Sequence, residues 1–199
     1  MPTFVTQDLL NSLENDVKQM LDKAKSLHVF DGTMLNTPPA PGKWSILQVM
    51  EHLNSYNRYY LPELESALQR GKQTGISFNT QFKSGWFGDY FTKMMMPGEG
   101  GKISNKMNAP KDHRPVAKLD AHKVISEFLA GEQKLISLLQ MALDTDMGKL
   151  RLPISISRLI KLKAGDTFRF LIAHQQRHFV QLQNAMNVLE LNKSAAYTA

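Results

Sequence analysis

The chain has 199 residues, 42% of them hydrophobic and 21% charged, which is the balance of an ordinary globular protein. It contains no cysteine, so disulfides, thiolate metal sites and a cysteine nucleophile are excluded, and any transition metal must be held by His, Asp, Glu or water. The net charge is +6, with much of the excess between Lys102 and Lys123, but no nucleic-acid-binding module accompanies this basic stretch, so a nucleic-acid partner is not expected.

The first predicted helix covers about residues 4–28. Its apolar residues recur at three- and four-residue steps, which is the period of a helix with one buried face. Thr6 is the predicted N-cap of this helix. The stretch "NTPPAPGKWS" follows, and its prolines favour extended backbone that ends the helical region.

A second helix is predicted for about residues 45–71. Ser45, with Gln48 three positions later, has the pattern of a capping box, in which each side chain accepts a hydrogen bond from the other residue's backbone N–H. Pro62 removes one backbone donor and is expected to bend this helix near Arg58.

The connection over residues 72–119 is far longer than the usual two to eight or so residues between packed helices. Its stretch "WFGDYFTKMMM" predicts a short helix over Trp86–Met96. Six side chains of this helix are expected to be available for burial: Trp86, Phe87, Tyr90, Phe91, Met94 and Met95.

The third and fourth long helices are predicted at about residues 121–144 and 166–190, with Asp120 and Asp166 as their N-caps. The stretch "KLRLPISISRLIKLKAG" between them is predicted to be an extended segment that leads into a short helical turn. Four amphipathic helices of this length indicate an all-α fold, namely a four-helix bundle with long crossover connections and a short extra helix in the 72–119 insertion.

The length predicts a single domain over residues 1–199. No apolar run approaches the roughly 18–20 residues needed to span a bilayer, and the N-terminus lacks the basic stretch and apolar core of a secretory signal. We therefore expect a cytoplasmic protein with no membrane partner. Leu47, Met50 and Val188 are surplus apolar residues, which predict either a homodimer interface or contacts with the long insertions.

Three of the six histidines need no functional role. His28 ends the first helix, where a cation interacts favourably with the helix dipole. His113 lies in the basic loop, and His122 lies in the first turn of the third helix.

His174 and His178 are four positions apart in the sequence, which places them on one face of a helix about 6 Å apart along its axis. Two imidazoles so placed can converge on one metal ion, although core packing also produces such pairs. The residue after His174 is Gln175, whereas the helix motif of zinc proteases requires Glu there as general base. That protease mechanism is therefore excluded.

His52 is the candidate third ligand. It shares a helix face with Val49 and Tyr56, beside the apolar stripe, where an imidazole without a hydrogen-bond partner would cost free energy. Its partner is either a metal shared with His174 and His178, or a backbone carbonyl or buried water. Three neutral imidazoles would leave a coordination position open for water or substrate.

The combination of these motifs resembles the DinB/YfiT-like superfamily of metalloenzymes, which is unrelated to the DNA polymerase of similar name. The resemblance rests on Trp44–Ser45 at a helix start, His52 about two turns later, and the pair His174 and His178 on the last helix. Arg177 and Gln181 also match that last helix.

The resemblance implies a four-helix bundle with a divalent metal, zinc or nickel, held by His52, His174 and His178. It further implies a homodimer and a thiol-dependent S-transferase that acts on a small-molecule substrate with a low-molecular-weight thiol. A metal-dependent hydrolase and a non-catalytic, metal-stabilised bundle that binds a small ligand or partner are the alternatives. Tyr56 and Gln181 are candidates to line the pocket or to hydrogen-bond to the metal ligands. No catalytic base is assigned, and the 72–119 insertion is expected to determine the substrate.

Overall fold

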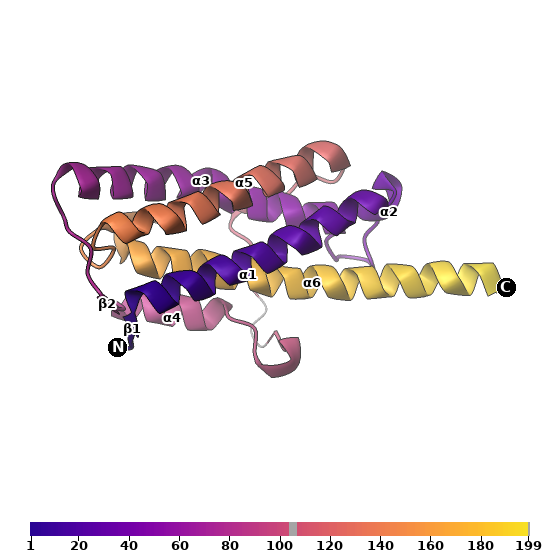
Figure 1. The fold of residues 1–199 in the computed structure, drawn as a ribbon. Coiled ribbons are helices and arrows are strands. Elements are labelled where there is room, and N and C mark those ends of the chain that lie inside the picture. The colour runs from indigo at the N-terminus through magenta and orange to yellow at the C-terminus, as the bar shows by residue number, and fades with distance from the viewer. Residues whose placement is uncertain (104–106, 199) are drawn as a thin grey trace.

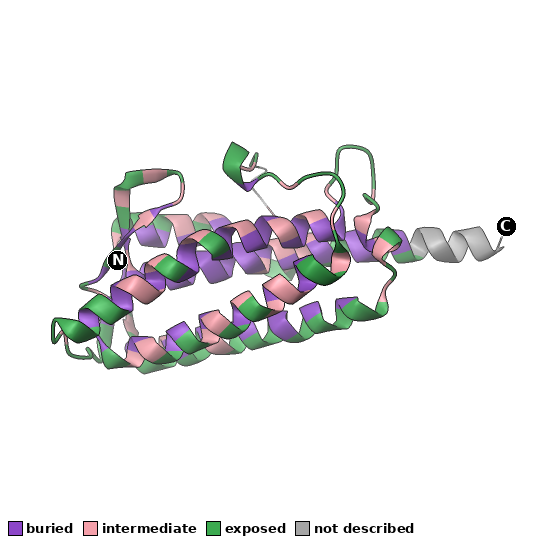
Figure 2. Ribbon diagram, turned by 90° about the horizontal axis from the view of Figure 1, so that it is seen from above, coloured by how far each residue is buried: buried purple, intermediate pink, exposed green. Residues whose placement is uncertain are grey.

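The computed structural model describes residues 1–103 and 107–198, with side chains described up to residue 190. The fold is mostly helical, and its four long helices lie side by side (Figure 1): α1 (Thr6–Ser26), α3 (Ile46–Gln73), α5 (Ala121–Met141) and α6 (Ala164–Thr198). Helices α3 and α1 each pack against both α5 and α6. The buried residues face the interior between these helices (Figure 2).

Short elements connect the long helices. Two are α-helices, α2 (Gly32–Asn36) and α4 (Trp86–Met95). Four are single 3₁₀ turns: η1 (Leu27–Val29), η2 (Glu99–Gly101), η3 (Lys111–His113) and η4 (Ala142–Asp144). The mostly helical composition and the short helix of the insertion agree with the sequence prediction.

The helix starts show which capping predictions were correct. The capping box of α3 is present, with the Ser45 N–H donating to Gln48 Oε1 (2.9 Å) and the Gln48 N–H donating to Ser45 Oγ (3.2 Å). Asp120 caps α5 by accepting from the Lys123 N–H at 2.9 Å. Thr6 is not a cap, because Val5 occupies the N-cap position and the Thr6 hydroxyl donates to the Asn79 carbonyl at 2.7 Å.

Two further local predictions concern proline and aspartate. Helix α3 continues through Pro62 without interruption. Helix α6 begins at Ala164, so Asp166 lies inside its first turn and is not its N-cap.

Four short strands form two antiparallel two-stranded sheets. Strand β1 (Thr3–Val5) pairs with β2 (Gln81–Lys83), and β3 (Arg151–Ile154) pairs with β4 (Ser157–Lys163). The predicted extended segment before α6 is therefore confirmed, but the predicted helical turn after it is wrong. That part forms β4, because Leu162 pairs with Leu152 across the hairpin and both side chains are buried.

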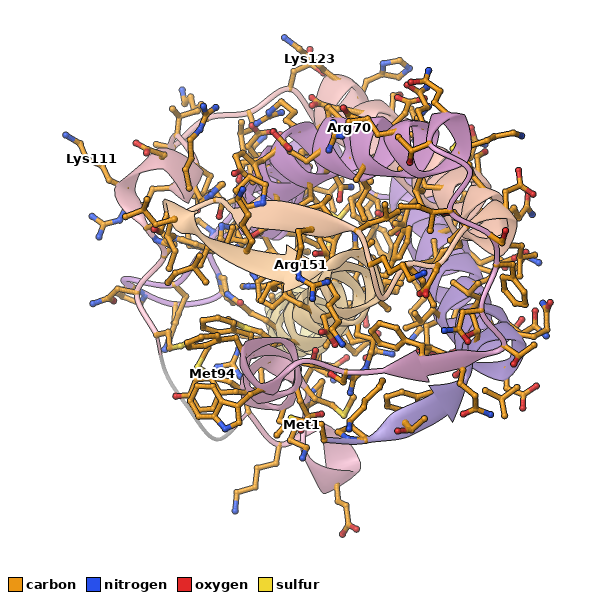
Figure 3. The ribbon with its side chains drawn as sticks, turned by 90° about the vertical axis from the view of Figure 1, so that its left-hand side faces the viewer. Met1, Arg70, Met94, Lys111, Lys123 and Arg151 are labelled. Carbon is orange, nitrogen blue, oxygen red and sulfur yellow. The ribbon has the colours of Figure 1, made fainter. Side chains whose placement is uncertain are left out.

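The β3–β4 hairpin crosses one end of the long helices, and Figure 3 looks at this end with Arg151 labelled on the hairpin. The Tyr59 hydroxyl donates to the Ile154 carbonyl (3.2 Å), and the Ser155 N–H donates to the Tyr60 hydroxyl (3.0 Å). These two bonds attach the hairpin to α3.

Helix α4 packs against α6 and buries only one of its sides. Of its six apolar side chains Met95 is buried, and Phe91 and Met94 are half-buried. Trp86, Phe87 and Tyr90 are 59%, 50% and 52% exposed, so their predicted burial is wrong. Their rings pack on one another instead, with 5.8 Å between the centroids of the stacked rings of Trp86 and Tyr90.

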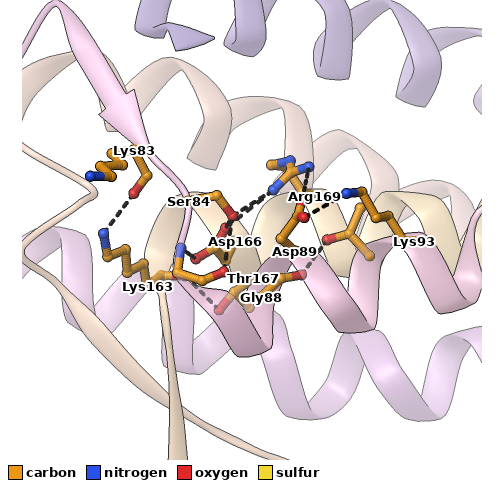
Figure 4. Close-up of polar contacts among 11 residues, drawn as sticks. Lys83, Ser84, Gly88, Asp89, Lys93, Lys163, Asp166, Thr167 and Arg169 are labelled. Atoms are coloured by element: carbon orange, nitrogen blue, oxygen red, sulfur yellow. Dashed lines mark hydrogen bonds and ion pairs between the residues drawn. The ribbon is translucent and has the colours of Figure 1, made fainter. Parts of the chain in front are cut away.

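A buried charged network fixes the start of α4 to α6 (Figure 4). The Asp166 carboxylate accepts hydrogen bonds from the Gly85 N–H (2.8 Å) and from the Ser84 hydroxyl. Arg169 bridges the two helices, with 3.3 Å from Nη1 to Asp166 and 3.2 Å from Nη2 to Asp89 on α4. Asp166 thus holds the start of α4 and does not cap α6, the helix on which it lies.

The surplus apolar residues occupy different environments. Leu47 and Met50 are completely buried in the core, so neither can contribute to a dimer surface, while Val188 is 40% exposed. Among the described residues, no helix combines the length and the apolar character needed to cross a membrane.

Candidate metal centre

The packing of α3 against α6 brings together the three histidines singled out by the sequence. His52 lies on α3, and His174 and His178 lie one turn apart on α6. One ring nitrogen from each of the three lies within 4.8 Å of the other two. His52 and His174 are buried, and His178 is half-buried. Within the described part of the chain, this is the one group of three or more metal-binding side chains that converges in this way.

The spacing of the ring nitrogens fits a shared metal ion. His52 Nε2 and His174 Nε2 are 3.2 Å apart. Two nitrogens bound to one tetrahedral zinc, each about 2.0–2.1 Å from it, are separated by roughly 3.3 Å. Two ring nitrogens this close need a proton or a cation between them, because otherwise their lone pairs repel.

Hydrogen bonds on the opposite ring nitrogens orient two of the three imidazoles. The His52 Nδ1–H donates to the His113 carbonyl at 2.7 Å, and the His178 Nδ1–H donates to Gln181 Oε1 at 3.0 Å. These bonds leave the Nε2 lone pairs of His52 and His178 free for a metal, which is the usual arrangement of metal-bound histidines. The remaining atom, His174 Nδ1, is buried without a hydrogen-bond partner among the described residues.

All three imidazoles are neutral at pH 7. Burial lowers the pKa of His52 to about 4 and that of His178 to about 3. Burial, together with the neighbouring imidazoles, lowers the pKa of His174 well below its usual value. Neutral imidazole is the form that binds metals, so an ion can enter at neutral pH without a net release of protons from these rings.

Aromatic rings surround the cluster. Tyr56 lies 4.2 Å from His174 between ring centroids, and burial raises its pKa to about 12, so its phenol stays protonated. Trp44 lies 5.0 Å from His52 and 6.4 Å from His178. Tyr56 and Gln181, the two residues expected near the site, therefore both lie beside the histidines.

His113 corrects an expectation from the sequence, which gave it no role in an exposed basic loop. It is buried, its ring lies 4.1 Å from Tyr56, and its Nδ1 is hydrogen-bonded to Ser55 Oγ at 2.9 Å. Its carbonyl is the acceptor that orients His52. No local signal indicates this contact, because His52 and His113 are 61 residues apart in the sequence. His28 and His122 are exposed and lie outside the cluster.

Behind the cluster lies a second polar group that the sequence did not indicate. Gln175, next to His174, donates from Nε2 to Glu132 (2.6 Å) and to Asn57 (3.2 Å) in the core. Asn57 also donates to Glu132 at 3.1 Å. Glu132 is completely buried, and this raises the pKa of its carboxyl to about 8. The uncharged surroundings of Glu132 therefore favour the protonated, neutral carboxyl at pH 7.

A cavity of about 860 Å³ reaches the three histidines, which all contribute to its wall. Its remaining wall comes from the loop before α3, from α3, α4 and α6, from residues 103 and 107–110 of the connection before α5, and from the β3–β4 hairpin. This volume lies within the range of about 300–1,000 Å³ that is typical of small-molecule sites. A molecule in the cavity has access to an ion held by the imidazoles, so the arrangement is compatible with a metal-binding protein.

No curated protein and no solved structure matches the chain. The sequence model of the DinB superfamily matches residues 17–182, which include all three histidines of the cluster. This match covers most of the length of the chain, so the chain belongs to the DinB superfamily.

Proposed function

We propose that this protein is a divalent-metal-dependent enzyme in which His52, His174 and His178 hold the ion, and that it transfers a low-molecular-weight thiol to an electrophilic carbon. The observation that carries this proposal is the convergence of three neutral imidazoles at the wall of a large cavity. Zinc and nickel are the proposed ions, because imidazole nitrogen suits both.

The chain's own residues set up the site for this chemistry. The His113 carbonyl and Gln181 hold His52 and His178 in the tautomer that presents Nε2 to an ion. A divalent ion, when bound, acts as a Lewis acid and lowers the pKa of the group in its open position. In the proposed transfer the thiol sulfur forms a bond to carbon, the leaving group departs with its bonding electrons, and the thiol proton passes to solvent.

Access to the histidines favours an enzyme over a non-catalytic bundle. A metal with a purely structural role sits in a closed site, whereas these three imidazoles face a cavity. Hydrolysis requires the same ion and the same access, so hydrolysis is distinguished from S-transfer by the assay below.

We further propose that residues 1–199 form one domain and that α1, α3, α5 and α6 form a four-helix bundle. The pairwise packing of α1 and α3 against α5 and α6 supports the bundle. A homodimer stays a prediction, and its interface has to lie away from Leu47 and Met50 because both are buried.

Metal content is the first test. The purified protein should carry about one divalent ion per chain by elemental analysis, and His52→Ala and His174→Ala should lose it. His122→Ala is the matched control, because this histidine is exposed and lies outside the cluster. Unchanged metal content in both cluster variants would disprove the three-histidine site.

The reaction is tested with metal-loaded protein and a panel of thiols, each offered with a chromogenic electrophile. S-transfer predicts thiol-dependent product formation that stops in His52→Ala. Product formation from ester or amide substrates without any thiol would support hydrolysis instead. Metal binding with neither reaction would favour the non-catalytic alternative.

A further inference from the structure

We propose that the cavity beside the three histidines binds an amphipathic anion as the acceptor substrate, with an extended apolar body along α4 and the β3–β4 hairpin and one anionic head near Arg177 and the imidazoles. This inference deepens the proposed function and rests on it for the metal that would face the head and for the role of the anion as acceptor.

The wall of the cavity away from the histidines is largely apolar, and three separate segments supply much of its apolar surface. Helix α4 contributes Phe91 and Met94, the hairpin contributes Ile154 and Leu162, and α6 contributes Phe170. The rings of Phe91 and Phe170 lie 6.3 Å apart and join α4 to α6. Methionine side chains adapt to irregular shapes, so this wall suits an extended hydrocarbon or aromatic body rather than a strongly hydrated one.

The position of α4 is fixed independently of any ligand. Asp166 and Arg169 hold the start of this helix to α6 through the Gly85 N–H and Asp89. The apolar wall therefore exists before a ligand arrives, which reduces the entropy that binding must overcome.

The charged residues among the described lining of the cavity have one sign. The described residues that line it include the cationic side chains of Lys43 and Arg177 but no carboxylate. Arg177 is buried and precedes His178 on α6, so its charge lies close to the imidazoles. Neutral imidazoles would leave the two positive charges of a bound ion uncompensated. A low-dielectric cavity with this charge distribution favours a ligand with a negative head.

The experiment uses the full chain with Trp86→Phe, so that Trp44, which lines the cavity, is the remaining tryptophan and reports binding by fluorescence. Metal-free and zinc-loaded protein are titrated with decanoate, decyl phosphate and decanol, and with carboxylates of six to twelve carbons. Calorimetry provides a second readout. We expect decanoate and decyl phosphate to bind at least about tenfold more tightly than decanol. Each added methylene should strengthen binding about three- to fourfold.

Both anionic probes share the predicted chemistry, and the tighter of the two identifies the head as carboxylate-like or phosphate-like. Arg177→Gln should reduce the preference for decanoate over decanol while decanol binding is retained, and Arg177→Lys should keep the preference. Met94→Arg should block all the ligands. Met96→Arg is its matched control, because Met96 is 51% exposed and does not line the cavity.

Equal affinities for decanoate and decanol would overturn the anionic head, and affinities independent of chain length would overturn the apolar body. The chain-length series in metal-free protein separates this inference from the proposed function. If the protein takes up no zinc but still shows the chain-length dependence and the Arg177 effect, the proposed function fails and the binding of an amphipathic anion in the cavity stands. If zinc binds and thiol transfer occurs without these dependences, this inference alone fails.

Discussion

Gln181 determines which nitrogen of His178 faces the cluster. Its Oε1 accepts the Nδ1–H of His178 at 3.0 Å and thereby keeps the Nε2 lone pair directed at the site. Acceptors of this kind fix the orientation of a metal-binding ring and increase its basicity. The corresponding acceptor for His52 is a backbone carbonyl, so Gln181 is the position where this effect can be tested by substitution.

Gln181→Leu should weaken zinc binding by about 10- to 100-fold, because the leucine cannot accept the His178 proton. The measurement is a competition titration against a chromogenic chelator. Gln181→Glu retains an acceptor and should bind zinc at least as tightly as the unmodified protein. Gln183→Leu is the control, because Gln183 is exposed and hydrogen-bonds only to Asn187 among the described contacts. Equal affinity in the Gln181→Leu variant would contradict a supporting role for this residue.

Glu132 predicts a pH dependence of stability. Burial raises its pKa to about 8 in the folded protein, against an ordinary value of 4.5, so between these values the folded state holds a proton that the unfolded state releases. Its contribution to stability is therefore full below about pH 4.5 and is lost as the pH rises through about 8.

Glu132→Gln should abolish this loss, because the amide stays neutral at every pH. In metal-free protein, thermal denaturation at pH 5 should give similar midpoints for the variant and the unmodified chain. At pH 9 the variant should be the more stable of the two. Glu190→Gln, at an exposed position of α6, is the control and should not reproduce the gain in stability at pH 9. A difference that shrinks as the pH rises would show that Glu132 is ionised in the core.

The sequence predicted the residues whose signals are local. The spacing of His174 and His178 places them on one helix face, and the stripe around His52 directs it to the core. His113 and Glu132 were missed for one physical reason. Their contacts join residues 61 or 43 positions apart, and only the packing of the helices creates them.

At the level of elements, the contact between α4 and α6 forms one wall of the cavity. Gly88 on α4 lies directly against α6, because a Cβ atom there would stand 2.2 Å from Asp166 Cγ. The carboxylate cannot easily move aside, because the Gly85 N–H, the Ser84 hydroxyl and Arg169 all hold it.

Gly88→Ala should therefore destabilise the protein by about 1–3 kcal/mol, the usual cost of overpacking. The gain in helix propensity, about 1 kcal/mol or less, opposes this effect. Chemical denaturation measures the difference. Gly32→Ala is the control, because a Cβ at that helix start would meet Ala121 Cβ at an ordinary 3.6 Å. Metal content should stay unchanged, since the histidines lie elsewhere on α3 and α6. Higher stability of Gly88→Ala would contradict the close approach of α4 to Asp166.

The elements that the sequence predicted correctly are those that carry their own periodicity or caps. The four long helices have the periodicity, and α3 and α5 also have the predicted caps, Ser45 with Gln48 and Asp120. The errors concern Thr6, Asp166, strand β4 and the exposed face of α4. For Thr6 and Asp166 a distant partner overrides the local preference: Asn79 takes the Thr6 hydroxyl, and Ser84 and Gly85 take the Asp166 carboxylate. On α4 the exposed rings pack on one another instead.

In the whole molecule, different parts of the chain supply the ligands and the walls of the site. Two long helices supply the three imidazoles, whereas the long connections supply α4, the hairpin and the carbonyl of His113. The ligands follow from helical periodicity and are predictable. The shape of the cavity depends on how the connections return to the helices, and single-sequence patterns do not encode this.

A metal bound by α3 and α6 together should stabilise the entire fold, because it joins segments more than a hundred residues apart in the sequence. An ion that binds only the folded state, present at a hundred times its dissociation constant, adds about 2.7 kcal/mol. For a chain of this size each kcal/mol raises the melting temperature by about 2–4 °C. Zinc or nickel at pH 7 should therefore raise it by about 5–10 °C, as measured by differential scanning fluorimetry.

The shift should disappear in His52→Ala and persist in His122→Ala, because only the first variant loses a member of the cluster. Magnesium should cause no shift, since it prefers oxygen ligands. A zinc shift of equal size in His52→Ala would place the stabilising ion outside this cluster.

Acid should act on the metal-free protein through the same residues. The pKa values of His52 and His178 are lowered to about 4 and 3 in the folded protein. As the pH falls from about 6.5, the unfolded chain therefore binds protons that the folded chain does not bind. Metal-free protein should lose stability steadily over that range, and His52→Phe should lose less.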